Sequence, residues 1–271
     1  MRCFTFPNQA VAAAKLGAPT ALIGRLGKDA FGDELKAFLA AQRVDLSFVQ
    51  QTSEAHTGTA LITIANANNT IVVVPGANVL VSAADVAAPA FAKGDIAVSQ
   101  FEIPLPSISA FFLRTRAAGV TTILNPAPAI EAKRELLDLV DILILNESEL
   151  DLLAKTGLRD TDDPARFLEA ARSLQTKGKT ICVTMGVLAL VESRPLIIPG
   201  RAVKTIDTTG AGDCFVGAVA AQLAAGTSIR DALHYANAAA SICVQRMGAA
   251  PSMPTAAEVL SASRPRESGD P

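Results

Sequence analysis

The chain has 271 residues, 50% of them hydrophobic, and a formal net charge of −2 at pH 7. A chain of this size buries a large core, which fits one α/β domain or a domain with a small appendage. The sequence has no cluster of Lys or Arg, one tyrosine and no tryptophan, which argues against nucleic acid and acidic membranes as partners.

The cysteines are scattered and have no CxxC spacing: they are Cys3, Cys182, Cys214 and Cys243. This pattern predicts reduced, mostly buried thiols in a cytoplasmic protein, and it argues against a zinc site or a disulfide framework. No apolar run is long enough to span a membrane, and the first residues lack the apolar stretch of a signal peptide. We therefore expect a cytoplasmic protein with no membrane partner.

Short strand-like runs alternate with helical periods through most of the chain. The runs typical of strands buried on both faces are 21–23, 95–99, 121–124, 141–145 and 180–184. The helical periods lie at about 30–41, 105–118, 129–138, 147–156 and 164–177. This alternation predicts βαβ crossovers and an α/β fold with a doubly wound, mostly parallel sheet flanked by helices.

Residues 57–75 interrupt this alternation, because two β-rich runs flank a polar turn at 66–69. They predict a β-hairpin, either an ordinary edge hairpin or part of a small lid. Further strands are expected at about 187–192, 196–198 and 202–206. We expect one domain over 1–262, followed by a disordered tail over 263–271, where apolar periodicity is absent.

The most informative stretch is Asp207-Thr208-Thr209-Gly210-Ala211-Gly212-Asp213, which leads into a small-residue helix predicted from Asp213 to Ala225. A helix N-terminus presents unpaired N–H groups and favours anions, and glycines let the backbone approach a phosphate. A carboxylate at this place would serve as a base that takes a proton from an attacking hydroxyl. The alternative is a glycine turn with an Asp N-cap.

The run from Asp207 to Ala218 resembles the C-terminal signature of the ribokinase-like (phosphofructokinase-B type) carbohydrate kinases. Other segments resemble this family in the same order, and together they cover about residues 8 to 260. These segments are 8–14 with 16–18, 24–32, 57–60, 76–78, 100–102, 125–128 and 146–149.

The resemblance implies ATP-dependent phosphorylation of a sugar hydroxyl, with D-ribose converted to D-ribose 5-phosphate. It implies that Asp213 is the base and that the Gly210, Ala211 and Gly212 amides form an anion hole. Asn8 and Glu102, together with Asp213, match sugar-binding positions of the family. From the residues alone, Glu102 is equally a loop carboxylate before Pro104.

The motif Asn146-x-x-Glu149 follows an expected strand and begins an expected helix, an arrangement that is also typical of a capping box. The resemblance implies that Glu149 organises Mg²⁺ through water near the nucleotide phosphates. The positions that match the ATP site are Asn146, Thr184, Gly186, Gly212 and Asn237. The family's second glycine after Gly186 is absent here, since Val187-Leu188-Ala189 follows. Asn237 is equally a polar residue that satisfies its own helix.

A loop for an activating monovalent cation, K⁺, is a further implication of the resemblance. The matching residues are Asp207, Thr209, Cys243, Arg246, Gly248 and Ser252. From the residues alone this is a plain loop. Cys214 also has two interpretations, a redox-sensitive thiol with a lowered pKa at a helix N-terminus or a packed small side chain.

The beginning of the chain departs from the family, because Cys3-Phe4-Thr5-Phe6-Pro7 stands where Gly-Gly-Lys-Gly-Ala is usual. We expect the opening strand, a sugar-binding Asp and the first lid strands to be missing, which would leave bare sheet edges. Two function classes follow: an active sugar kinase, or a remnant that binds nucleotide with weak turnover. Another sugar or a nucleoside is an alternative acceptor. A complete lid would imply a homodimer.

Overall fold

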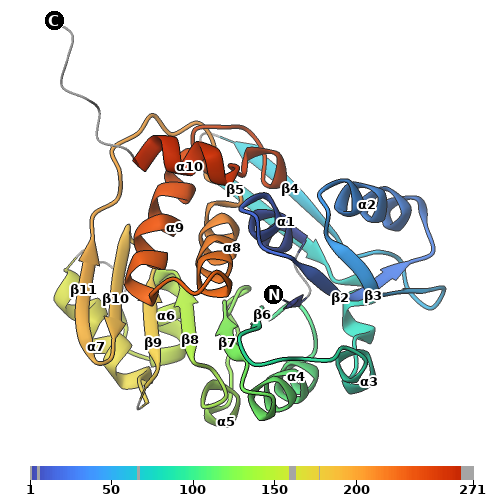
Figure 1. Cartoon of the computed structure of the whole chain (residues 1–271), viewed down its shortest axis with the longest axis horizontal. Coiled ribbons are helices and arrows are strands. Elements are labelled where there is room, and N and C mark those ends of the chain that lie inside the picture. The colour runs from blue at the N-terminus through green and yellow to red at the C-terminus, as the bar shows by residue number, and fades with distance from the viewer. Residues whose placement is uncertain (1, 5–6, 66–67, 159–162, 177, 264–271) are drawn as a thin grey trace, which may run out of the picture.

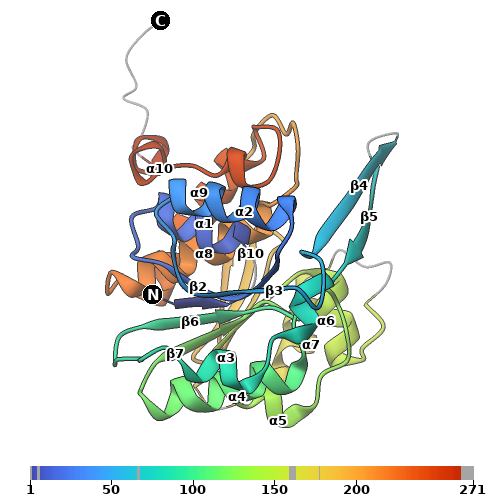
Figure 2. The same ribbon diagram turned by 90° about the vertical axis from the view of Figure 1, so that its right-hand side faces the viewer.

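The computed structural model describes residues 2–4, 7–65, 68–158, 163–176 and 178–263, and its core is a twisted sheet between two layers of helices (Figures 1 and 2). Within these residues nine strands form the sheet, in the order β11-β10-β9-β8-β7-β6-β1-β2-β3. Their bounds are β1 Arg2–Phe4, β2 Ala21–Gly27, β3 Asp45–Thr52, β6 Ile96–Ser99, β7 Thr121–Leu124, β8 Ile142–Leu145, β9 Thr180–Val183, β10 Val187–Val191 and β11 Arg194–Ile198. The pairs from β3 to β9 are parallel, and β10 and β11 add antiparallel edge strands.

Neighbouring residues of each central strand belong to opposite cores, as the two-residue period of a strand requires. Ile142 and Ile144 pack into one hydrophobic core, while Leu143 and Leu145 pack into the other. Because both faces of the sheet are covered, these strands are continuous apolar runs. This confirms the predicted doubly wound, mostly parallel sheet.

Helices cover both faces of the sheet, as Figure 2 shows. One layer contains α1 Pro7–Lys15, α2 Ala30–Ala41, α8 Ala211–Ala224, α9 Ile229–Cys243 and α10 Ala256–Ser263. The other contains α3 Ala83–Ala87, α4 Leu105–Ala117, α5 Arg134–Leu137, α6 Glu147–Ala154 and α7 Pro164–Leu174. Two 3₁₀ turns, η1 Gly76–Leu80 and η2 Ala250–Ser252, complete the described elements. Across the described ranges, no helix combines the length and the apolar character needed to cross a membrane.

The predicted hairpin is present as β4 Thr59–Ala65 and β5 Asn68–Val74, an antiparallel pair that forms a separate two-stranded sheet. Figure 2 shows this hairpin standing away from the main body. Part of the predicted turn, residues 66–67, lies outside the described residues. The hairpin has the position that a lid over the carboxyl edge of the sheet requires.

The expectation of a missing opening strand is wrong. β1 pairs in parallel with β2 on one side and with β6 on the other. It therefore supplies hydrogen-bond partners to two strands that would otherwise have unpaired edges. Three residues are enough for this pairing. A run of three residues has too little periodicity for the sequence to predict a strand.

Two further elements differ from the sequence prediction, and a third prediction is not tested. Residues 202–206 form no strand; instead the Ile206 amide donates to the Val244 carbonyl at 2.8 Å. The helix expected over 129–138 is reduced to α5. The predicted tail, apart from Ser263 at the end of α10, lies outside the described residues.

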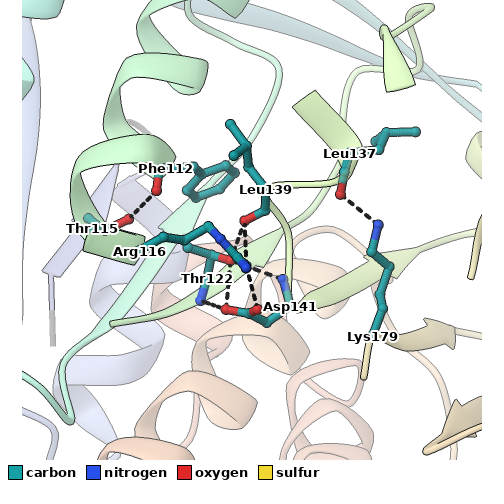
Figure 3. A network of polar contacts seen from close by, with 8 residues as sticks. All are labelled: Phe112, Thr115, Arg116, Thr122, Leu137, Leu139, Asp141 and Lys179. Carbon is teal, nitrogen blue, oxygen red and sulfur yellow. Dashed lines mark hydrogen bonds and ion pairs between the residues drawn. The ribbon is translucent and has the colours of Figure 1, made fainter. Parts of the chain in front are cut away.

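The amino edge of the sheet is held by a polar network, which Figure 3 shows. Asp141 accepts hydrogen bonds from the Thr122 amide at 2.9 Å and from Arg116 at 2.6 Å. Nearby, Lys179 donates to the Leu137 carbonyl at 2.6 Å, and burial lowers its pKa to about 8. These contacts fix the starts of β7, β8 and β9.

Candidate active site

The candidate site lies at the carboxyl edge of the sheet, where the strand order reverses at β1 and β6. Open α/β sheets bind ligands at such switch points because the loops diverge there and leave a crevice. Polar residues that directly follow or closely follow these strand ends are Asn8 and Gln9 after β1, Glu102 after β6, Asn125 after β7, Asn146 after β8 and Thr184 after β9.

The N-terminus of α8 faces this crevice. Gly210 caps the helix in the left-handed region, with φ of 77°, and an added Cβ would lie 2.9 Å from the Ala249 Cα. This conformation and this close approach both require glycine. The helix begins at Ala211, so the predicted start at Asp213 is wrong by two residues, and Asp213 lies in the first turn. The Ala211 amide donates to the Thr208 carbonyl at 3.2 Å, so a bound anion would compete for it.

Two amides from α1 hold the Asp213 carboxylate. Asn8 Nδ2 donates to Oδ2 at 3.1 Å, and Gln9 Nε2 donates to Oδ1 at 2.9 Å. The approach of α1 depends on Gly217 of α8, where an added Cβ would meet the Ala12 Cβ at 2.5 Å and the Gln9 carbonyl oxygen at 2.7 Å. A glycine one turn after Asp213 thus allows α1 to reach the carboxylate.

Burial alters the acidity of both carboxyl groups in the crevice. It raises the pKa of Asp213 to about 6, while the Gln9 and Asn8 hydrogen bonds act in the opposite direction. Burial, together with the charge of Asp213, raises the pKa of Glu102 to about 8. At pH 7 Asp213 is therefore mostly ionised and able to accept a proton, while Glu102 is mostly protonated.

Asn8, Glu102 and Asp213, the three predicted sugar-binding residues, line one cavity of about 690 Å³. The hairpin contributes Thr59 and Val73 to the wall of this cavity. A space of this size suits a small molecule rather than a polymer. The structure thus brings together residues from α1, α8, the loop after β6 and the hairpin.

The capping-box interpretation of Asn146-x-x-Glu149 is confirmed. Asn146 Oδ1 accepts from the Glu149 amide at 2.9 Å, and Glu149 Oε2 accepts from the Asn146 amide at 2.9 Å. Burial raises the pKa of Glu149, with smaller contributions from Glu147 and Asp213. Because the charges of Glu149 and Asp213 interact, a cation bound near them would relieve their repulsion.

The other predicted nucleotide residues form two groups. Thr184 lies at the end of β9, and its amide donates to the Leu145 carbonyl at 3.0 Å, beside Asn146. An added Cβ on Gly186 would lie 2.6 Å from the Gly200 amide nitrogen, so the turn after β9 touches the loop after β11. Asn237 holds the same loop, because its Nδ2 donates to the Pro199 carbonyl at 2.9 Å. Through this bond Asn237 satisfies a neighbouring loop.

The residues predicted for a monovalent cation converge from two loops. Asp207 accepts hydrogen bonds from the Thr209 and Gly248 amides, each at 2.9 Å. A hydrogen bond with the Thr209 side chain, and then these two amide bonds, lower the pKa of Asp207. Cys243 Sγ lies 2.9 Å from Ser252 Oγ, which donates to the Ala249 carbonyl at 2.6 Å. Arg246 is close to the same loop, with its guanidinium 3.5 Å from the Ser252 carbonyl oxygen.

Cys214 is a packed side chain, since its exposed fraction is zero. A hydrogen bond with Cys243, and then burial, raise its pKa, which contradicts the interpretation as an activated thiol. Cys182, Cys214 and Cys243 are all free and buried, as predicted.

Sequence reasoning missed three buried or half-buried amides behind Asp213: Gln9, Gln100 and Asn125. It also missed a contact at the base of the hairpin, where the Asp29 carboxylate accepts from the Thr57 amide at 2.7 Å. All of these residues belong to segments that carry the family resemblance. Their pairing was not readable, because the partners are far apart in the sequence.

The comparison with protein families agrees with this geometry. The pfkB family carbohydrate kinase profile matches residues 7–256. The chain therefore belongs to the pfkB family of carbohydrate kinases, which are phosphotransferases.

Among individual proteins, the chain is 38% identical to the ribokinase of Staphylococcus aureus over 259 residues, covering 93% of this chain and 84% of the relative. It is 37% identical to the ribokinase of Bacillus subtilis over 260 residues, with the same two coverages. The structure of Arabidopsis thaliana ribokinase complexed with ribose and ATP superposes with a TM-score of 0.83 at 32% identity, covering 94% of this chain and 85% of that one.

Proposed function

We propose that this chain transfers a phosphoryl group from ATP to D-ribose and forms D-ribose 5-phosphate. The observation that carries the proposal is the Asp213 carboxylate, held by two amides at the N-terminus of α8 and facing the cavity that Asn8 and Glu102 also line. The ribokinase relatives and the ribose- and ATP-bound structure of a relative support the choice of substrates.

In this mechanism the sugar lies in the 690 Å³ cavity with its attacking hydroxyl against Asp213. The hydroxyl oxygen forms a bond to the γ-phosphorus of ATP, its proton passes to the Asp213 carboxylate, and the bond between phosphorus and the ADP oxygen breaks. The N-terminal amides of α8, at Gly210 and Gly212 above all, stabilise negative charge on the transferring group. Positioning and electrostatics therefore supply most of the catalysis.

The nucleotide would extend from α8 across the ends of β8 and β9, past Asn146, Thr184 and Gly186, towards Asn237. Mg²⁺ bound to its phosphates would neutralise their charge. Glu149 fits a role in holding that ion through water, because it is a buried carboxyl whose charge already interacts with that of Asp213. Its two oxygens accept hydrogen bonds from Asn146, which favours indirect contact through water.

The 207–209 and 248–252 loops fit a monovalent cation such as K⁺. They meet through the bond from the Gly248 amide to Asp207, and they combine one carboxylate with several backbone carbonyls. In this arrangement Asp207 would contribute its carboxylate and Ser252 its hydroxyl. The backbone oxygens would come from Thr209, Cys243, Arg246 and Gly248. A low charge count suits a monovalent ion better than a divalent one.

The test of the proposed function is ribose-dependent ADP formation with Mg²⁺ and K⁺, compared between the unaltered chain and Asp213→Asn. We expect the variant to keep ATP affinity and to lose at least ~10²-fold in turnover, because it cannot accept the proton. The same assay in sodium-only buffer should show reduced turnover. Near-normal turnover by Asp213→Asn would refute the assignment of the base, and equal rates in the two buffers would refute K⁺ activation.

The alternative of a weak, nucleotide-binding remnant loses one of its reasons, because β1 is present and paired. Other acceptors belong in the same assay: a relative named deoxyribokinase is 35% identical over 222 residues. Turnover with a different sugar or a nucleoside at a higher kcat/KM than with ribose would move the proposal to that acceptor.

We infer that the hairpin joins a second copy of this chain. Leu61 and Val72 form a cross-strand pair and are 69% and 55% exposed, on the face opposite to Ala60 and Val73. A second hairpin would cover this apolar pair. Sedimentation of the unaltered chain should give a dimer, and the double variant Leu61→Ser with Val72→Ser should be a monomer. A monomeric unaltered chain would contradict this inference.

The buried free thiols also support a cytoplasmic location, because such thiols stay reduced there. Cell fractionation tests this location.

A further inference from the structure

A chain of side-chain amides lies behind Asp213, on the side away from the cavity. Gln9 Nε2 donates both to Asp213 Oδ1 at 2.9 Å and to Asn125 Oδ1 at 3.0 Å, and its Oε1 accepts from Gln100 Nε2. Gln9 and Gln100 are 1% and 2% exposed. Buried amides of this kind are expensive to leave unpaired, so their orientations are fixed by their partners.

A backbone carbonyl fixes the orientation of the side-chain amides in this series. Asn125 Nδ2 donates to the Ile144 carbonyl of β8 at 3.0 Å. A carbonyl only accepts, so the Asn125 amide must turn its NH₂ to β8 and its oxygen to Gln9. Gln9 must then turn its own NH₂ to Asn125, and the second N–H of that group points at Asp213. The Ile144 carbonyl of β8 therefore fixes the orientation in which the NH₂ group of Gln9, and not its oxygen, contacts Asp213.

We propose that Gln9 is a positioning residue for the catalytic base, held in one orientation by Asn125, Gln100 and the Ile144 carbonyl. This inference rests on the proposed kinase function. Gln9 occupies Oδ1 on the buried side, so Oδ2, on the side of the cavity-lining Asn8, receives the proton of the sugar hydroxyl.

The surroundings of Asp213 make this donor important. The described groups whose pKa the charge of Asp213 raises are Glu102, Glu149, Cys214 and Cys243, and all four are acids. The amide donors of Asn8 and Gln9, together with the N-terminus of α8, favour the ionised form of the base. Asn8 touches the cavity and is free to exchange its partner for a sugar, whereas Gln9 is buried and remains in place when the site is empty or filled.

The first experiment uses the unaltered protein. Side-chain amide NMR of Gln9, recorded across pH 4.5 to 8, should show one Nε2 proton shifting with the ionisation of Asp213, while the other follows it weakly. Titration of the Asp213 carboxyl carbon provides the reference pKa. If neither proton responds to the carboxyl titration, the contact is absent and the proposal is overturned. This readout does not depend on turnover.

The second experiment compares Gln9→Met and Gln9→Glu with Thr122→Val, a matched buried polar change in the network at the amino edge. Gln9→Met removes the donor, so the pKa of Asp213 should rise by about one unit and kcat should fall roughly tenfold or more, because the base is misaligned. KM for ATP should stay within about twofold. Gln9→Glu, nearly isosteric, should raise the same pKa further, because a like charge faces Asp213.

Thr122→Val should lower the melting temperature and leave the pKa of Asp213 unchanged. If the role of Gln9 were only structural, Gln9→Met would behave like this control. A folded Gln9→Met variant with an unchanged pKa of Asp213 and an unchanged kcat would overturn the proposal. If Gln9→Met does not fold, the amide titration of the unaltered protein decides. Absence of turnover in the unaltered chain would refute the proposed function instead, and would leave the titration result standing.

Discussion

Asp213 is subject to opposing influences on its acidity. Withdrawal from water favours the neutral acid, whereas the Asn8 and Gln9 donors favour the carboxylate. Burial is the larger influence, and the pKa settles at about 6 instead of its ordinary 3.8. A base with such a pKa is still ionised at neutral pH and holds a proton better than an exposed aspartate does. This balance suits proton acceptance from a hydroxyl.

The raised pKa predicts the acid limit of activity. Only ionised Asp213 accepts the proton, so kcat/KM for the sugar should be level near neutrality and fall about tenfold per pH unit below pH 6. The check is a pH profile between 4.5 and 8, with folding followed by circular dichroism at each pH. Undiminished activity near pH 4.5 would show that the base titrates like an exposed aspartate.

At the level of elements, the site depends on how closely α1 approaches α8. Gly217 is the contact point, and α1 carries both residues that hold Asp213. Small residues line this part of α8, which lets the two helix backbones lie nearly against each other. The functional consequence is that helix packing, more than any loop, sets the position of the base.

Gly217→Ala should damage both stability and turnover. The new methyl group would lie 2.5 Å from the Ala12 Cβ and 2.7 Å from the Gln9 carbonyl oxygen, so α1 must shift. Such overpacking costs about 1–3 kcal/mol, and moving Gln9 should lower kcat. Gly200→Ala is the control, because its nearest contact would be an ordinary 3.7 Å. Equal melting temperatures and kcat for the two variants would contradict this account.

At the level of the whole molecule, the hairpin is tied to the main sheet through one carboxylate. Asp29 caps α2 by accepting from the Gly32 amide at 2.8 Å, and it also accepts from the Thr57 amide and hydroxyl. The Thr57 hydroxyl in turn accepts from the Gly27 amide at 2.9 Å. Helix α2, strand β2 and the base of the lid thus share one small polar cluster.

Asp29→Asn separates the two roles of Asp29, which are to cap α2 and to hold Thr57 at the base of the hairpin. The amide oxygen can still cap α2 at Gly32, but its NH₂ would then face the Thr57 amide, donor against donor. We expect helix content to be kept, the base of the hairpin to loosen, and KM for the sugar to rise about three- to tenfold with a smaller change in kcat. Asp29→Ala should lose both functions. Unchanged KM in Asp29→Asn would mean that the lid is positioned without this contact.

Much of this architecture is specified over short distances along the chain. The Asn146–Glu149 capping box joins residues three apart, and the hairpin joins neighbouring strands, so both were predictable from the sequence. The apolar runs of the central strands predicted a sheet buried on both faces, and the 207–213 motif predicted a helix N-terminus with its carboxylate. These signals are local periodicities and local hydrogen bonds.

The tertiary structure decided what lies far apart in the sequence. Gln9 and Asp213 are separated by 204 residues, and only the packing of α1 on α8 at Gly217 brings them together. The three residues of β1 become a strand because β2 and β6 provide partners on both sides, whereas 202–206 remains a loop held by Val244. Such outcomes depend on residues that are distant in the sequence, and no local pattern identifies them. The sequence alone therefore determined most of the elements and the motif, but not the set of contacts that orients the base.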